Sequence, residues 1–230
     1  MVEQLTLDFP HSASFYAEDL VVTSSNRAAF NLIKSWPDWS SPTVLLVGTH
    51  GSGKSHFAQV WREKAGAFVA HCDNLEEAIK HAQDNVAILL EDLAPGEFSE
   101  TELFHLLNVV QQQHSIAPAS TMLLTSSVSF LHKKIALADL ASRLESLPQV
   151  TLQNADDELL RAVAIKIFSD LQIQVDSSVL NYLLCRTERS LSALTALIKQ
   201  LDQLALMRKS KITKGLVSQL LSSNEEKSCL

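Results

Sequence analysis

The sequence contains little glycine, proline or cysteine, with six, six and three of these residues among 230. So few glycines and prolines, in a chain that is 46% hydrophobic, exclude a low-complexity polymer and indicate a folded globular protein. Cys72, Cys185 and Cys229 are far apart and odd in number, which does not fit a zinc site or a disulfide framework. We therefore expect a reduced, cytoplasmic protein.

The sequence also lacks an excess of basic residues, a signal peptide and an apolar run of membrane-spanning length. Lysine and arginine number 19 against 26 aspartates and glutamates, so the formal net charge is −7. A negative protein has no overall attraction for a phosphodiester backbone, so any nucleic-acid contact must be local or made through a partner. We expect a soluble protein without a membrane partner.

Short apolar runs alternate with helical patterns through the first two-thirds of the chain. The runs predict buried strands, because they are short, rich in branched side chains and bounded by turns. Helical spacing is found between them, for example from Lys54 to Ala65 and from Leu103 to Val110. The predicted strands are TVLLVG from Thr43, FVAH from Phe68, VAILLEDL from Val86, TMLLTSS from Thr121 and PQVTL from Pro148. This alternation predicts an α/β domain with a parallel sheet.

After residue 153 the strand signal disappears and only helical periodicity remains. Asn154 is the expected N-cap of the first of these helices, with Asp157 at its third position. The chain therefore divides into an α/β domain followed by a small all-helical domain. The predicted boundaries are 1–18 for an extended tail, 19–153 for the nucleotide-binding domain, 154–223 for the helical lid domain and 224–230 for a frayed end.

The segment GTHGSGKS matches the phosphate-binding pattern GxxxxGK[ST]. It lies directly after a predicted buried strand and opens a predicted helix, which is the context that the mechanism needs. Glycines let the backbone N–H groups converge on phosphate oxygens, and Lys54 reaches the β and γ phosphates of ATP or ADP. The alternative is a plain turn between strand and helix. The predicted contacts are Gly48, Thr49, His50, Gly51, Ser52, Gly53, Lys54, Ser55 and His56.

A magnesium site is predicted beside this loop. Ser55 offers a hydroxyl, and the acidic partner is expected at the end of a neighbouring strand, where VAILLEDL supplies Glu91 and Asp92. The alternative for these two acids is a solvated strand end.

With these features the chain resembles an AAA+ module of the DnaA branch. VVTSSNRAAF resembles the segment that lines the adenine pocket in DnaA relatives, which implies contacts from Leu20, Val21 and Asn26. TMLLTSS resembles the sensor 1 strand, which implies that Thr125 or Ser126 faces the γ-phosphate, although Ser127 replaces the usual following aspartate.

Two arginines take positions that matter in this family. DLASRLESLPQVTL resembles box VII, so Arg143 stands where an arginine finger is supplied to a neighbour's nucleotide. RTERSL resembles the start of the sensor 2 helix, so Arg189 matches the arginine that touches nucleotide from the lid, with Arg186 as the fallback. The alternative for each is an ordinary exposed arginine.

The N-terminal segment QLTLDF resembles a sliding-clamp-binding hexapeptide and comprises Gln4, Leu5, Thr6, Leu7, Asp8 and Phe9. In an extended peptide Leu7 and Phe9 lie on one side and fill an apolar pocket, while the Gln4 amide makes polar contacts. The alternative is an edge strand or tail with chance apolar residues. Together with the absence of a C-terminal DNA-reading domain, this motif makes the chain similar to the Hda/HdaA family of DnaA regulators.

The resemblance implies a protein that binds the DNA-loaded β clamp of DNA polymerase III, contacts DNA through that clamp, and stimulates hydrolysis of DnaA-bound ATP through Arg143. A homodimer is also allowed. Glu91 stands where relatives place the Mg²⁺-binding aspartate and Asp92 where active ATPases carry a catalytic glutamate, so we expect weak or absent hydrolysis in the protein's own site. The alternatives are an autonomous AAA+ ATPase that loads or remodels replication proteins, and a noncatalytic clamp adaptor.

Overall fold

Five strands form one parallel sheet in the first domain of the computed structural model, which describes residues 20–94, 96–127 and 135–228. The sheet order is β2-β3-β4-β1-β5, and every neighbouring pair is parallel. This arrangement confirms the predicted parallel α/β fold. The strands are β1 (Thr43–Gly48), β2 (Phe68–Ala70), β3 (Ile88–Leu93), β4 (Met122–Ser126) and β5 (Gln149–Leu152).

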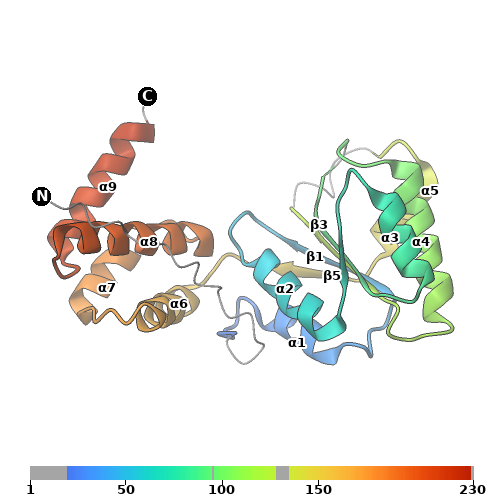
Figure 1. Cartoon of the computed structure of the whole chain (residues 1–230), viewed down its shortest axis with the longest axis horizontal. Helices are drawn as coiled ribbons and strands as arrows, with labels where there is room; N and C mark the ends of the chain where they lie inside the picture. Colours follow the sequence, from blue (N-terminus) through green and yellow to red (C-terminus); the bar gives the residue numbers. More distant parts are fainter. Residues whose placement is uncertain (1–19, 95, 128–134, 229–230) are drawn as a thin grey trace, which may run out of the picture.

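Helices cover both faces of the sheet (Figure 1). One face packs against α1 (Arg27–Ser35) and α2 (Lys54–Ala65), and the other against α3 (Leu75–Gln83), α4 (Glu100–His114) and α5 (Ala138–Ser146). Because neither face is open to water, the central strands are almost wholly apolar rather than alternating. The phosphate loop leads into α2 on one face, and Arg143 lies on α5 on the other.

The second domain contains α6 (Asp157–Asp170), α7 (Ser177–Leu184), α8 (Leu191–Arg208) and α9 (Lys214–Ser228). Its helices bury a core of their own, separate from the two sheet cores, with Leu194, Ile198 and Leu201 of α8 at its centre. Figure 1 shows this domain beside the carboxyl end of β1. The arrangement confirms the predicted helical lid after the sheet.

The helix cap at the start of the lid differs from the prediction. Asp156, not Asn154, is the N-cap of α6, and its Oδ1 accepts a hydrogen bond of 2.7 Å from the Leu159 amide. Asn154 instead accepts a 2.8 Å hydrogen bond from the hydroxyl of Thr49 in the phosphate loop. The prediction was wrong because a long-range partner, which local spacing does not reveal, engages Asn154.

The last helix extends beyond the apolar pattern that predicts it. That pattern ends at Leu221, whereas α9 continues to Ser228, so residues 224–228, expected to be frayed, continue the helix. Glutamate and lysine in this stretch are good helix formers, and no glycine or proline interrupts it. Within the described ranges, no helix is long and apolar enough to cross a membrane.

Candidate nucleotide site and partner face

The phosphate loop connects the end of β1 to the start of α2. Gly51 and Gly53 have φ angles of +73° and +100°, a left-handed backbone that residues with a Cβ rarely adopt. Gly53 is the N-cap of α2, and no side chain caps this helix start. Uncapped amides at a helix N-terminus, preceded by a glycine-rich curl, favour the binding of phosphate.

Lys54 is buried within the loop at 8% exposure. Its ammonium donates hydrogen bonds to the carbonyls of Gly48 and Thr49 at 3.0 and 3.1 Å. An ammonium has three donors, so one remains for a phosphate oxygen. The nearby Ser52 hydroxyl is also buried and has no hydrogen-bond partner among the described residues. A bound phosphate would provide partners for both groups.

Glu91 lies at the end of β3 with the pKa of its carboxyl group raised above the ordinary value. Burial is the main cause, the charge of Asp92 adds to it, and a hydrogen bond with Ser55 and the charge of Arg62 oppose it. Its Oε1 is buried and has no partner among the described residues. A divalent cation would stabilise the ionised carboxylate, so Ser55 and Glu91 fit a magnesium site.

This donor set is small, as expected for magnesium that is held mainly by phosphate and water. In the described part of the chain, no group of three or more His, Cys, Asp or Glu side chains is arranged to hold a metal ion by itself.

Asp92 is placed differently from Glu91. It is exposed, its φ angle is +51°, and it lies where the register between β3 and β4 shifts. Its backbone amide donates a 2.9 Å hydrogen bond to the hydroxyl of Thr125. Thr125, predicted to face the γ-phosphate, is completely buried and supports the backbone of this bulge. The Thr125 hydroxyl therefore helps to fix the backbone position of Asp92.

The lid contacts the phosphate loop directly, which the sequence did not predict. The Leu191 amide, at the start of α8, donates a 2.9 Å hydrogen bond to the carbonyl of Gly51. A Cβ on Gly51 would lie 2.1 Å from Oγ of Ser190, the side chain that caps α8. The left-handed loop and the lid helix therefore fit together only with glycine at this position.

The predicted adenine segment lies between the two domains. Leu20 packs against the core under α1 and α2, whereas Val21 packs against the lid core. Asn26 is buried; its Nδ2 donates to the Val21 carbonyl at 2.8 Å and its Oδ1 accepts from the Thr23 amide at 2.9 Å. The Asn26 side chain thus fixes the backbone of this segment, and contact of Leu20 and Val21 with a base stays a prediction.

Asp156 connects this segment to the lid. Its carboxylate accepts a 3.1 Å hydrogen bond from the Ser24 hydroxyl in addition to capping α6. Desolvation acts to raise its pKa, but the hydrogen bonds from the Leu159 amide and from the hydroxyls of Thr23, Ser24 and Ser25 outweigh it, so the pKa is lowered. Ionised Asp156 therefore holds the two domains together at this point.

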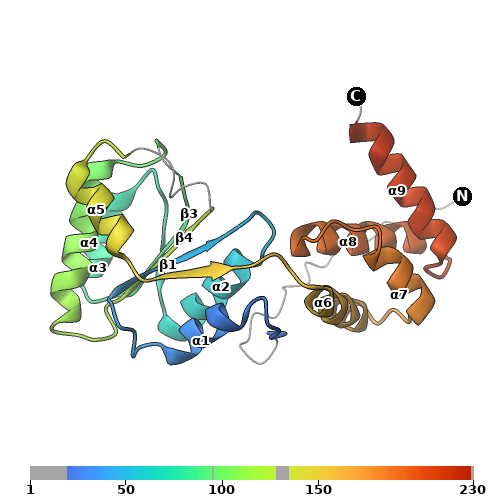
Figure 2. The same ribbon diagram turned by 180° about the vertical axis from the view of Figure 1, so that it is seen from behind.

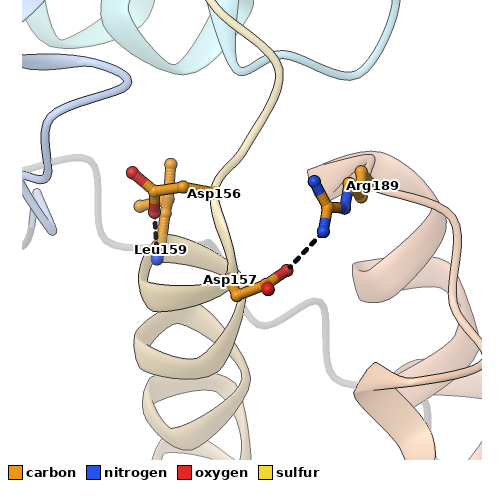
Figure 3. Close-up of polar contacts among 4 residues, drawn as sticks. All are labelled: Asp156, Asp157, Leu159 and Arg189. Atoms are coloured by element: carbon orange, nitrogen blue, oxygen red, sulfur yellow. Dashed lines mark hydrogen bonds and ion pairs between the residues drawn. The ribbon is translucent and has the colours of Figure 1, made fainter.

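Arg189, predicted to touch nucleotide from the lid, pairs with Asp157 in Figure 3. The two charged groups lie 3.3 Å apart, and their side chains are 69% and 82% exposed. Such an exposed pair contributes little stability, so a nucleotide would displace Asp157 at small cost. The fallback residue Arg186 instead stacks on the Tyr182 ring, with its guanidinium carbon 4.1 Å from the ring centre.

Arg143 lies away from this site. It belongs to α5, which packs with α3 and α4 on the sheet face opposite α2. Both views show α5 far from the junction between sheet and lid (Figures 1 and 2). Its guanidinium donates a single 3.0 Å hydrogen bond to the Asn108 side chain of α4. Arg143 is half-buried, so part of its side chain is exposed to solvent at this face.

The other predicted residues fall in two groups. Thr49 and His50 are exposed at the tip of the loop, and the His56 ring lies edge-on to Phe57. The clamp-motif residues lie outside the described residues: Gln4, Leu5, Leu7, Asp8 and Phe9.

A parallel sheet in the order β2-β3-β4-β1-β5, a glycine-rich loop after β1 and a helical lid against that loop define the AAA+ fold. Solved structures agree with this class. Domain III of DnaA from Thermotoga maritima matches with a TM-score of 0.71 and 18% identity, covering 91% of this chain and 96% of that chain. AMPPCP-bound DnaA from Aquifex aeolicus matches with a TM-score of 0.70 and 18% identity, and the match covers 93% of this chain and 70% of that chain.

The RuvB branch-migration motor of Thermotoga maritima has a similar fold, with a TM-score of 0.66, 11% identity and coverage of 86% of this chain and 68% of that chain. No protein with a curated description matches in sequence. Residues 159–221 match the family described as "Hda, lid domain". The helical lid is therefore similar to the Hda lid, and the whole chain shares the fold of the DnaA AAA+ domains.

Proposed function

We propose that this protein binds the DNA-loaded sliding clamp and stimulates hydrolysis of DnaA-bound ATP by supplying Arg143 in trans. The result is negative regulation of replication initiation. DnaA and the β clamp of DNA polymerase III are its partners, and DNA is reached through the clamp. The proposal places the protein in the cytoplasm, where these partners act.

The position of Arg143 is the observation that carries this proposal. A guanidinium stabilises the charge that develops on a transferred phosphoryl group only if it reaches that group. Arg143 lies on the face opposite α2, so it is remote from the protein's own phosphate loop and accessible to another molecule. Its one neutral partner, the Asn108 amide, is a weaker partner than an anionic phosphate would be.

The protein's own site supports binding of ADP or ATP with Mg²⁺ more than turnover. Ser55 and Glu91 would hold the ion, and the third donor of Lys54 would reach phosphate. Asp92 takes the place of the catalytic glutamate but has a shorter side chain and sits on a bulge that Thr125 holds. A displacement of about 1 Å in a catalytic group costs roughly a hundredfold in rate. The bound nucleotide would therefore organise the sheet and lid rather than drive a cycle.

The sliding clamp would be bound through the N-terminal segment QLTLDF. Leu7 and Phe9 would enter an apolar pocket, with polar contacts from Gln4. Docking by such a short peptide brings the AAA+ module close to other molecules on the same DNA, which raises its effective concentration there. This attachment would account for how a module with a negative net charge acts on DNA.

The test is an ATPase assay with DnaA, DNA-loaded clamp and this protein. We expect Arg143→Ala to lower the stimulated rate by about 10³-fold or more, as for other arginine fingers, while its own nucleotide affinity is unchanged. The matched control is Arg161→Ala. Arg161 also donates one hydrogen bond to an amide side chain, Asn181, at 2.6 Å, but it lies on the lid. The control should stimulate normally.

Three outcomes would contradict the proposal. If Arg143→Ala stimulated the DnaA ATPase normally, the protein would be a clamp adaptor that supplies no catalytic arginine. Steady ATP turnover by the purified protein, lost in Lys54→Ala, would indicate an autonomous ATPase. Unchanged clamp binding after deletion of residues 1–9 would exclude docking through QLTLDF.

A further inference from the structure

The turn between α8 and α9 carries a concentrated positive charge that the nucleotide site does not use. The segment LMRKSKITK, residues 206–214, contains four basic residues and no acidic one. The whole protein has a formal net charge of −7, so this turn is a local exception. We call Arg208, Lys209, Lys211 and Lys214 the basic turn. The sequence contains no acidic residue between Asp202 and Glu225.

All four basic side chains are exposed. None of them forms an ion pair with a side chain that the structure describes, a set that leaves out the side chains of residues 223–228. Arg208 donates a 2.7 Å hydrogen bond to the Gln219 side chain, which is neutral, so its charge is not compensated there. Four exposed cations in one short turn therefore form a locally positive patch on a protein of negative net charge.

The basic turn is held in a defined shape by its neighbours. Lys209 ends α8 in a left-handed conformation, with its amide bonded to the carbonyls of Ala205 and Leu206. Ile212 is buried in the lid core at 6% exposure, and the Thr213 hydroxyl accepts the Leu216 amide at 3.3 Å at the start of α9. The charges therefore project from a fixed backbone. Figures 1 and 2 show this turn at the end of the lid farthest from the sheet.

The residues around the turn restrict what it can bind. Residues 203–222 include no aromatic side chain, so there is no platform on which unpaired bases would stack. Leu206 and Met207 are 62% and 69% exposed, but two residues do not form the apolar face that a membrane surface requires. The apolar face of α8 is already used in the lid core. The chemistry that remains is attraction to a dense, regular line of phosphates.

We propose that the basic turn binds the phosphate backbone of double-stranded DNA, without reading its sequence. Duplex DNA carries one negative charge per about 1.7 Å of helix axis, so several cations in one short turn meet several phosphates. The hydroxyls of Ser210 and Thr213 lie within the same turn and add neutral hydrogen-bonding groups. This contact is a property of the lid, independent of Arg143 and of the N-terminal segment.

The experiment measures the anisotropy of a short fluorescent duplex of random sequence against the purified protein, without DnaA or clamp, over a series of salt concentrations. We expect weak binding. The logarithm of the association constant should fall linearly with the logarithm of the salt concentration, with a slope between about −2 and −4 for two to four phosphate contacts. The double variant Lys209→Asn with Lys211→Gln should weaken binding by about tenfold or more and reduce the slope by about 2. Asparagine is chosen at 209 because it tolerates the left-handed conformation.

The matched control removes the same charge elsewhere, with Lys34→Gln and Lys80→Gln on the sheet domain, where both side chains are exposed. It should bind duplex like the unchanged protein. Equal loss in both double variants would overturn the proposal, because net charge alone would then explain binding. Absence of duplex binding at low salt would also overturn it, as would binding to anionic lipid vesicles but not to duplex. Thermal unfolding of both variants checks that each is folded.

Discussion

The sheet domain and the lid differ in how they are built and in what they contribute. The sheet is buried by helices on both faces, so it has an apolar core on each side. The lid has one core among its helices, and its surface contributes polar groups to the phosphate loop. The sheet domain thus carries the glycine-rich loop on which the proposed nucleotide binding depends, and the lid carries the segment that matches a particular family.

The difference is informative because the two domains meet at the nucleotide site. Leu191 donates to the loop carbonyl of Gly51, and Asp156 accepts from Ser24 of the segment ahead of the sheet. A ligand at the phosphate loop would therefore affect both domains together. Substitutions of Lys54, Gly51 and Asp156 would test this link.

Substitution of Lys54 should separate ligand binding from folding. Lys54→Ala removes the donor for phosphate, so the stabilisation by saturating Mg-nucleotide, about 2.7 kcal/mol at a hundredfold excess over Kd, should vanish in a thermal-shift assay. The matched control is Lys64→Ala. Lys64 also donates to backbone carbonyls, those of Ile33, Lys34 and Trp36, but lies at the far end of α2. If Lys64→Ala lost the ligand shift as well, Lys54 would have no specific role.

Substitution of Gly51 tests the fit between loop and lid. Gly51→Ala adds a Cβ 2.1 Å from Ser190 Oγ in a left-handed backbone, so we expect a loss of about 2–3 kcal/mol in unfolding free energy. Gly66→Ala is the control, because Gly66 has a φ angle of +62° but no atom within 4 Å of its added Cβ. It should cost only the backbone strain, about 1 kcal/mol. Equal losses in chemical denaturation would show that the lid does not restrict the loop.

Substitution of Asp156 tests the link ahead of the sheet. Asp156→Ala removes the cap of α6 and the partner of Ser24, and we expect a loss of about 1 kcal/mol at neutral pH. The pKa of Asp156 is lowered in the folded state, so its contribution is present above its unfolded pKa and is lost as the pH falls through its folded value. The difference in unfolding free energy between the unchanged protein and Asp156→Ala should therefore shrink below about pH 4.

Asp176→Ala is the control for this effect. Asp176 is the N-cap residue of α7, but its side chain makes no capping hydrogen bond. Its removal should change stability little and leave the pH dependence of unfolding intact. A loss as large as that of Asp156→Ala would mean that the helix dipole, and not the two hydrogen bonds, accounts for the result.

Much of the fold was predictable because its signals are local. The apolar runs predicted all five strands, and the helical spacing from Lys54 to Ala65 matches α2. The phosphate loop was predictable for the same reason, since glycine, lysine and serine act there within a few residues of one another. The placement of Glu91 and Asp92 at the end of β3 also follows from the apolar run before them.

The details of the site were less predictable, because they depend on partners far away in the sequence. Asn154 fits the local pattern of a helix cap, but Thr49 engages it and Asp156 takes the cap. Thr125 or Ser126 was expected to face the γ-phosphate, and no local pattern indicated that the Thr125 hydroxyl also accepts from the Asp92 amide across the strand pair. No local pattern in the sequence predicted the ion pair between Arg189 and Asp157, because the two residues are far apart along the chain.

Local signals in the sequence were enough to predict the strands, the glycine-rich loop and the change to an all-helical second domain, because periodicity and turn chemistry act over one element at a time. The strand order, the contact between Leu191 and Gly51, and the position of Arg143 on the face opposite α2 became visible only in the folded chain. These features arise when distant segments pack together, and their energies depend on burial and geometry that no single segment contains.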